Sequence, residues 1–407
     1  MNVQIFAPVA GGPLTQYVSF LLPPLLELVD RGLVSGVTVT LARAHYESDF
    51  FLEYLRPYSS RVEFDVIDLP LGNRLASTLT MSQALLSSIA RVRADFVISV
   101  YADYGASILA LRCRIPGLGT ALVRVDSIGI VHHGHTGPVR GMRQAFRNGI
   151  HRLTRRNSPW SETLVVNPML YDVIASGERR QPKHRLVPHP VTRPAAVARD
   201  VARASLGIAP DGRYLVSVGR TDGRKAIPEL LSAFREANLP SDVRLLLAGL
   251  LHEPHRTLIE TSFADLVSSG RIVLIDRHLT TDEVQLAFFA ADVAAVTYYP
   301  MDDLSANMLS AIAADRPVLI NAHGYGERIN RDFALGWSTN VLDPTTFAAT
   351  IARAMTECAT FEPSERAARL VAFHGPKNYV ETVLRRLKVR VGIEPTEVHD
   401  WDWVMAS

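Results

Sequence analysis

A glycine and two basic residues follow a predicted strand in the middle of the chain. The strand-like stretch Tyr214–Val218 runs into Gly219, Arg220, a polar loop and then Lys225. Glycine lets the backbone approach a ligand closely, arginine offers a fork for phosphate oxygens, and lysine supplies a mobile positive charge. The spacing matches neither the P-loop nor the dinucleotide-binding glycine motif. It indicates either an anion site or a solvated basic turn.

A second segment that could bind an anion is PMDDLSANMLSAIAADRPVLIN, residues 300–321. Its apolar residues recur every four positions, which predicts a helix, and a strand follows. Asp302, Asp303 or Ser305 would cap the helix, and the amides around Asn307–Leu309 would lie where the helix dipole favours an anion. The alternative is a plain helix of a βαβ unit with an acidic cap.

Alternating strands and helices are expected to position both segments. The chain has 407 residues, 47% of them hydrophobic and 21% charged, and this length suits two globular domains of about 200 residues. In both halves this alternation predicts a doubly wound parallel sheet covered by helices. The Pro- and Arg-rich segment 179–203 is the expected linker between them. In such sheets ligands bind at the carboxyl ends of the strands.

The expected strands are Val3–Phe6, Val37–Leu41, Val62–Ile67, Phe96–Val100, Thr120–Val125, Tyr214–Val218, Val243–Ala248, Ile272–Ile275, Val293–Val296 and Val318–Ile320. The expected helices are 15–29, 76–91, 227–237, 257–267, 282–289, 305–313 and 345–356. Pro23 and Pro24 are expected to kink or shorten the first helix.

Charge and cysteine content narrow the class of protein. A formal net charge of +2 gives no global basic field that would hold nucleic acid. Cys113 and Cys358 lie far apart without a partner motif, which argues against a disulfide framework or a zinc site. No apolar run approaches the roughly 18–20 residues that span a bilayer, and the N-terminus predicts a strand rather than a signal peptide. We expect a cytoplasmic protein.

Taken together, these segments resemble the C-terminal domain of GT-B glycosyltransferases, most closely the retaining family 4, or group 1, type. The stretch VSVGRTDGRKAIPELLSAF resembles the family pattern V-G-R-x4-K-G-x4-L-x-A-F, with Gly219, Arg220 and Lys225 in register. The stretch AIAADRPVLI resembles A-M-A-x-G-x-P-V-V. The resemblance covers roughly residues 185–320 well and the first half loosely.

The resemblance implies an α/β protein of two Rossmann-like domains that face each other across a cleft. Residues 1–190, completed by a C-terminal helix 378–407, would bind the acceptor, and residues 191–377 would bind a nucleotide-sugar. The implied enzyme moves a sugar to an acceptor nucleophile, with retention of anomeric configuration and without a metal. No cofactor is expected, because the nucleotide-sugar is a co-substrate. The acceptor is a small molecule, a glycan or a lipid-linked molecule, and no nucleic acid is involved.

By position in the family pattern, Arg220 and Lys225 would hold the donor diphosphate, and Asp302 would bind sugar hydroxyls. The base would lie near Arg277 and His278. The full expected donor set is Gly219, Arg220, Lys225, Arg277, His278, Ser305, Asn307, Met308, Leu309 and Ser310.

Several positions depart from the family pattern. Asp302 and Ser310 stand where Glu-x7-Glu is usual, and Ser310 cannot accept both ribose hydroxyls as a glutamate does. Ala226 and Asp315 stand where glycines are usual, and aspartate tolerates the left-handed conformation. These departures leave open a specialised donor, a GT-B-like binding or partner subunit without turnover, and a nucleotide-sugar epimerase of the same architecture.

The first half carries the candidates for acceptor binding and for contact with the sugar. The family often places histidine after the fifth strand against the donor sugar, and this loop holds three histidines. A metal site and a surface loop are the alternatives. The catalytic candidates are Asp302, His132, His133 and Asp126, the last at the end of the expected fifth strand. The acceptor-binding candidates are Gly11, Gly12, Tyr101 and His135.

Two further segments are distinctive in composition. Arg140–Arg156 contains six arginines and no acid, which predicts a basic amphipathic helix. It would contact an anionic membrane peripherally, recognise an anionic acceptor, or lie solvated on its own domain. Trp401 and Trp403 either anchor the terminal segment on its return to the first domain or belong to a frayed tail.

Overall fold

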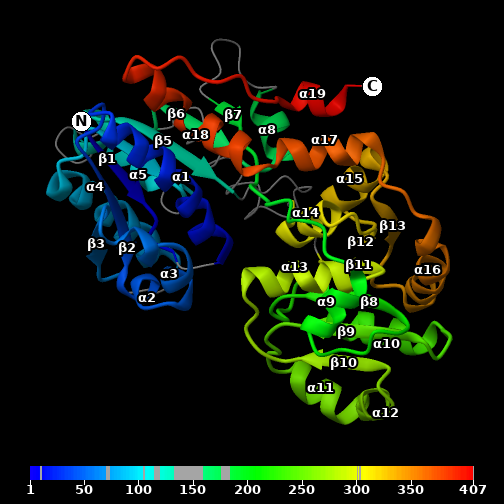
Figure 1. Ribbon diagram of the computed structural model, residues 1–407. Coiled ribbons are helices and arrows are strands. Elements are labelled where there is room, and N and C mark those ends of the chain that lie inside the picture. Colours follow the sequence, from blue (N-terminus) through cyan, green and yellow to red (C-terminus); the bar gives the residue numbers. More distant parts are fainter. Residues whose placement is uncertain are drawn as a thin grey trace. The chain divides into compact units, whose positions relative to one another are not determined.

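The computed structural model describes residues 1–9, 12–69, 74–103, 106–113, 120–132, 159–175, 184–299, 301 and 304–406. These residues form two compact units, each built on its own parallel sheet (Figure 1). The first unit comprises Met1–Pro190 and Pro376–His399, and the second comprises Val191–Gly375 and Asp400–Ser407. The segment 378–407, expected as a single helix of the first domain, is thus divided between the two units.

The sheet of the first unit has seven parallel strands in the order β3-β2-β1-β4-β5-β6-β7. Its strands are β1 (Asn2–Phe6), β2 (Gly36–Ala42), β3 (Glu63–Ile67), β4 (Phe96–Ser99), β5 (Asp126–Val131), β6 (Glu162–Val165) and β7 (His184–Leu186). The strand order reverses between β1 and β4, and doubly wound sheets bind ligands at the carboxyl end of such a reversal.

The helices of the first unit cover two faces of this sheet. They are α1 (Gly12–Asp30), α2 (Arg43–Tyr46), α3 (Asp49–Tyr54), α4 (Arg74–Val92), α5 (Ala106–Arg112), α6 (Thr120–Val123), α8 (Pro168–Ala175) and α18 (Pro376–Arg390). One core cluster joins α1 and α18 to the sheet, and another joins α4, α5 and α6 to it. Pro23 and Pro24 do not end α1, because Leu22, Leu25 and Leu26 on either side of them are buried against the sheet.

One expected strand of the first unit was wrong. Thr120–Val123 forms the short helix α6, and the strand begins only at Asp126. A short apolar run is compatible with either structure, and here Leu122 is buried in the core beneath α4. The error moves Asp126 from the end of a strand to the start of the next one.

The sheet of the second unit has six parallel strands in the order β10-β9-β8-β11-β12-β13, so its reversal lies between β8 and β11. Its strands are β8 (Arg213–Val218), β9 (Val243–Ala248), β10 (Ile272–Ile275), β11 (Val293–Val296), β12 (Val318–Asn321) and β13 (Gly336–Thr339). The four central strands are almost wholly buried, as expected for a parallel sheet covered on both faces.

The helices of the second unit are α9 (Arg199–Ser205), α10 (Ile227–Glu236), α11 (His255–Ser262), α12 (Ala264–Ser268), α13 (Thr281–Ala290), α14 (Ala306–Ala313), α15 (Tyr325–Phe333), α16 (Pro344–Glu357), α17 (Glu365–Phe373) and α19 (Trp401–Met405). The expected helix 257–267 is two helices that meet at Phe263. The expected linker 179–203 contains β7 and the start of α9. Trp401 packs against Phe333 and Phe373 and so fastens α19 to the second unit.

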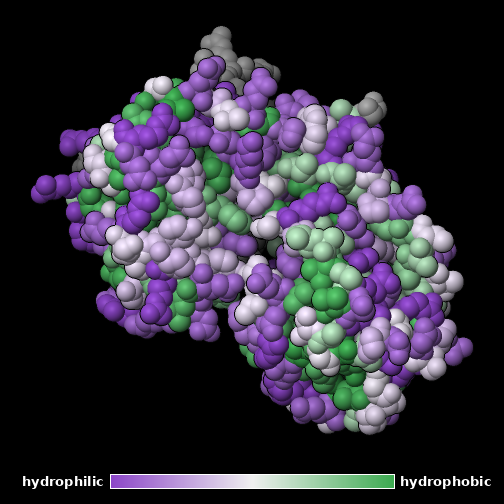
Figure 2. Space-filling view, in the orientation of Figure 1, coloured by the Kyte–Doolittle hydropathy of each residue, from purple (hydrophilic) through white to green (hydrophobic). Residues whose placement is uncertain are grey.

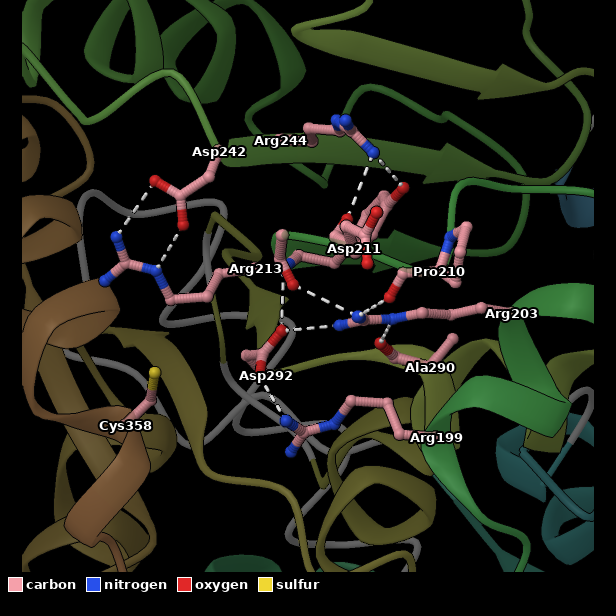
Figure 3. Close-up of polar contacts among 12 residues, drawn as sticks. Arg199, Arg203, Pro210, Asp211, Arg213, Asp242, Arg244, Ala290, Asp292 and Cys358 are labelled. Carbon is pink, nitrogen blue, oxygen red and sulfur yellow. Dashed lines mark hydrogen bonds and ion pairs between the residues drawn. The ribbon is translucent and has the colours of Figure 1, made fainter.

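A buried ion pair fastens α9 to the amino end of the second sheet (Figure 3). Arg203 and Asp292 are both buried, and the guanidinium Nη2 lies 2.9 Å from the carboxylate Oδ2. The same carboxylate accepts the Tyr214 amide at 2.8 Å and pairs with Arg199 at 2.8 Å. The remaining Arg203 donors reach the carbonyls of Ala290, Pro210 and Gly212. Each of the three guanidinium nitrogens of Arg203 thus has an acceptor, which is what a buried charge requires.

On the face shown in Figure 2, hydrophilic residues cover most of the surface and hydrophobic residues form separate patches. Among the helices that the structure describes, none has the length and apolar character needed to cross a membrane.

Candidate functional site

The loop after β8 folds its lysine back onto the end of the strand. Lys225 is only 7% exposed, and its Nζ donates a hydrogen bond to the Val218 carbonyl. Within the described parts of the chain its ammonium group makes no other hydrogen bond and no ion pair. Burial lowers the pKa of Lys225 to about 8, and the nearby Asp222 only partly opposes this effect. Among the described residues, this buried cation therefore has donors without an acceptor.

The N-terminus of α14 reaches the same carbonyl from a distant part of the sequence. Asn307 Nδ2 donates to the Val218 carbonyl at 2.7 Å and to the Tyr298 hydroxyl at 3.2 Å. Ser305 is the N-cap, and its hydroxyl accepts the Met308 amide at 3.4 Å. Both expected anion segments thus converge at the point where the strand order reverses. A helix N-terminus and a buried ammonium group together favour a bound anion.

Two glycines let the backbones approach closely at this point. Gly219 has a φ of +90°, and a Cβ there would lie 3.2 Å from Lys225 Nζ. Gly249, at the end of β9, would place a Cβ 2.6 Å from the Gly219 carbonyl carbon. Ala226 and Asp315, which replace the glycines of the family pattern, both adopt the left-handed conformation, with φ of +48° and +56°. The expectation that Asp315 tolerates this conformation is confirmed.

The other two arginines of the expected donor site differ in whether their guanidinium groups are already paired with an acidic side chain. Arg220 is exposed and forms no ion pair with any described residue. Arg277 pairs with Glu283, which also completes the capping box of α13 with Thr280. The hydrogen bond from Arg277 lowers the pKa of Glu283 to about 2. Arg277 follows β10 as expected, next to His278, but its guanidinium is already engaged.

The other residues expected to contact the donor are either buried or lie outside the described residues. Met308 and Leu309 are completely buried, so that only their backbone can serve a ligand, and Ser310 is 8% exposed. Asp302 lies outside the described residues, and its expected contact with sugar hydroxyls stays a prediction.

His132 lies at the carboxyl end of the first sheet, directly after β5. Its Nε2 donates to the Val100 carbonyl at 2.8 Å, and its backbone amide donates to Asp103 Oδ2 at 2.9 Å. The imidazole lies parallel to the rings of Tyr101 and Tyr17, with centroids 5.3 and 6.0 Å away. The ends of β4 and β5 thus bring together the catalytic candidate His132 and the acceptor-binding candidate Tyr101.

Asp126 does not join them. It begins β5 at the amino end of the sheet, where Arg386 Nε donates to its Oδ1 at 2.5 Å and Arg390 lies 3.6 Å from its Oδ2. Its assignment as a catalytic candidate rested on the misplaced strand and is corrected here: the carboxylate fastens α18 to the sheet. Gly12 begins α1. Gly11, His133, His135 and the segment Arg140–Arg156 lie outside the described residues.

The sequence analysis did not identify His45 and Tyr17 at the carboxyl end of the first sheet. His45 is fully buried and joins Thr15 Oγ1 at 2.8 Å to the Ala7 carbonyl at 3.1 Å, and burial lowers its pKa. Tyr17 hydrogen-bonds His189 through its hydroxyl. The sequence does show that these residues follow the ends of strands by one to three helical turns, which could have identified them as candidates. It does not show which face of a helix points toward the site.

Groups of three or more histidine, cysteine or acidic side chains that could hold a metal ion do not occur among the described residues.

Comparison with known proteins identifies the second unit. Residues 198–370 match the family model of glycosyl transferases group 1. The chain also resembles three solved structures: HepE of Anabaena in complex with UDP and glucose, a sucrose-phosphate synthase of Thermosynechococcus elongatus, and WaaG, a glycosyltransferase involved in lipopolysaccharide biosynthesis. No curated protein sequence matches the chain.

These three likenesses extend over nearly the whole chain at low identity. HepE has 14% identity and a TM-score of 0.66, with 96% of this chain and 100% of that chain covered. The synthase has 15% identity and a TM-score of 0.61, with 96% and 97% covered. WaaG has 14% identity and a TM-score of 0.60, with 96% and 99% covered.

The family match and the fold agree. The chain has the GT-B fold, and residues 198–370 of its second unit match the group 1 glycosyltransferases. The expectation of a GT-B glycosyltransferase is thereby confirmed.

Proposed function

We propose that this protein transfers a sugar from a nucleotide-sugar to an acceptor nucleophile, with retention of anomeric configuration and without a metal. The observation that carries the proposal is the buried ammonium group of Lys225, which has one hydrogen bond to a described residue. It lies in the loop that bears Arg220 and shares an acceptor with Asn307 in the first turn of α14. The fold relative HepE was solved with UDP and with UDP-glucose, which supports a nucleotide-sugar donor.

The chemistry follows from charge. As the glycosidic bond of the donor breaks, the leaving nucleoside diphosphate gains negative charge. Lys225, Arg220 and the amides at the start of α14 would stabilise that charge in the transition state. Fixed protein cations would then do the work that a divalent metal does elsewhere. His132 and Tyr101, at the carboxyl end of the first sheet, remain the proposed contacts for the sugar or the acceptor.

The first experiment is thermal denaturation of the purified protein against nucleoside diphosphates and nucleotide-sugars. A ligand at about 100 times its dissociation constant adds roughly 2.7 kcal/mol of stability, which gives a visible rise in Tm. We expect one nucleotide family to raise Tm, with the same rise in the presence of EDTA. No rise with any nucleotide would contradict the proposed donor class, and a rise abolished by EDTA would contradict metal independence.

Stereochemistry can be tested before the acceptor is known. Many transferases slowly hydrolyse their donor, and proton NMR of the first sugar released reports its anomeric configuration. The proposal expects the configuration of the donor. Binding without any hydrolysis or transfer would favour the alternative of a binding or partner subunit, which the serine at position 310 keeps open.

A further inference from the structure

Tyr298 lies two residues beyond the end of β11 and beside the proposed anion site. It is not one of the proposed ligands of the diphosphate. Its hydroxyl accepts one of the two Asn307 Nδ2 hydrogens at 3.2 Å. The other Asn307 hydrogen goes to the Val218 carbonyl at 2.7 Å. Both amide hydrogens of Asn307 are therefore used inside the protein.

This arrangement assigns a definite role to Asn307. With both hydrogens engaged, the side-chain amide has no donor left for a phosphate. Its effect is instead to tie the first turn of α14 to the end of β8, next to Lys225. The backbone amides of that turn are then held at a fixed distance from the ammonium group. The tie depends on the Tyr298 hydroxyl, which sets the orientation of the amide.

The backbone and the ring of Tyr298 are fixed independently. Its carbonyl accepts a hydrogen bond from Asn321 Nδ2 at 3.0 Å, and Asn321 is fully buried at the end of β12. The Arg224 guanidinium carbon lies 5.9 Å from the centre of the ring, within the range of a cation–π contact. Arg224 precedes Lys225 in the loop after β8. The Tyr298 side chain therefore contacts both the loop after β8 and the first turn of α14.

We propose that Tyr298 is a positioning residue for the diphosphate of the donor, because its hydroxyl orients the Asn307 amide that ties α14 to the end of β8 beside Lys225. This inference rests on the proposed function, since it concerns the same anion. Tyr298 itself need not touch the ligand. Its loss should weaken the contacts made to the diphosphate and leave those made to the nucleoside unchanged.

The test is Tyr298→Phe, which removes only the hydroxyl, with Tyr299→Phe as the matched control. Tyr299 is 41% exposed, and its side chain has no part in the tie. Calorimetry would compare the nucleoside diphosphate that binds the unaltered protein with its nucleoside. A lost hydrogen bond of this kind corresponds to about a fivefold to tenfold weaker binding. We expect this weakening for the diphosphate in Tyr298→Phe alone, with the nucleoside affinity unchanged.

Three other outcomes of the calorimetry would contradict the proposal, each for a different reason. Equal diphosphate affinity in the two variants and the unaltered protein would overturn the positioning role. Equal weakening of diphosphate and nucleoside, with a lowered Tm, would also overturn it and would indicate a general structural role. Failure of the unaltered protein to bind any nucleoside diphosphate would overturn the proposed function, and this inference with it.

Discussion

Replacement of Lys225 by methionine should stabilise the protein while it abolishes binding of the diphosphate. Burial lowers the pKa of Lys225 from 10.5 to about 8. At about 1.36 kcal/mol per pKa unit, holding the charged form in this environment costs about 3 kcal/mol at pH 7. Methionine has a similar length and no charge, and the Val218 carbonyl keeps its hydrogen bond from Asn307. The cost should therefore disappear in Lys225→Met.

The pH dependence of stability gives a second measure of the same effect. Because the folded-state pKa of Lys225 is lower than the unfolded value of 10.5, the unfolded chain binds more protons between about pH 8 and 10.5. This group therefore makes the free energy of unfolding rise with pH across that window. Below about pH 8 its destabilising effect is constant. The rise should be absent from Lys225→Met.

The assay is thermal denaturation with and without the bound nucleotide, at pH 7 and at several values up to pH 10. A change of 1 kcal/mol shifts Tm by roughly 2–4 °C in a domain of this size, so that Lys225→Met should melt about 6–12 °C higher without ligand. Saturating nucleotide should raise Tm for the unaltered protein and not for the variant. Arg220→Met is the control: it removes an exposed charge, so its ligand-free Tm should not change while its nucleotide affinity falls.

Two results would refute this reasoning. A lower ligand-free Tm for Lys225→Met would mean that the ammonium group stabilises the fold through its contacts, so that it is not kept there at a cost for a ligand. A Tm that rises for the variant with nucleotide as it does for the unaltered protein would remove Lys225 from the anion site.

Three further substitutions test other parts of the structure. Ala226→Gly should stabilise the second unit by about 0.5–1 kcal/mol in thermal denaturation, because the residue has a φ of +48°, and a lower Tm would count against this. Gly219→Ala should weaken nucleotide binding about tenfold in calorimetry, because its Cβ would lie 3.2 Å from Lys225 Nζ at a φ of +90°. Unchanged affinity would contradict that contact. Asp292→Asn, at the buried ion pair, should lower the free energy of unfolding by about 3 kcal/mol in urea denaturation. Arg235→Met, at an exposed ion pair, should lower it by less than about 1 kcal/mol. Equal losses in the two variants would refute the greater importance of the buried pair.

Local patterns predicted five of the six strands of the second unit, but not β13 and several of its helices, such as α15 and α17. The strand Tyr214–Val218, for example, differs from β8 by a single residue at its start. The predictions failed where a short apolar run fits two structures, as at Thr120–Val125, which contains the helix α6. There the packing against α4 decided the outcome. That single error also misplaced Asp126, because a residue at the end of one strand and a residue at the start of the next lie at opposite edges of a sheet.

The sequence by itself determined the order of strand, loop and helix that carries Gly219, Arg220 and Lys225, because that order depends on neighbouring residues. Only the tertiary structure decided that Asn307 and Lys225 share the Val218 carbonyl, since Asn307 and Val218 are 89 residues apart. It also decided that Lys225 is buried and Arg220 exposed, although both are basic residues of one loop. Burial and hydrogen bonding between distant segments depend on how the elements pack, and no local pattern of residues records them.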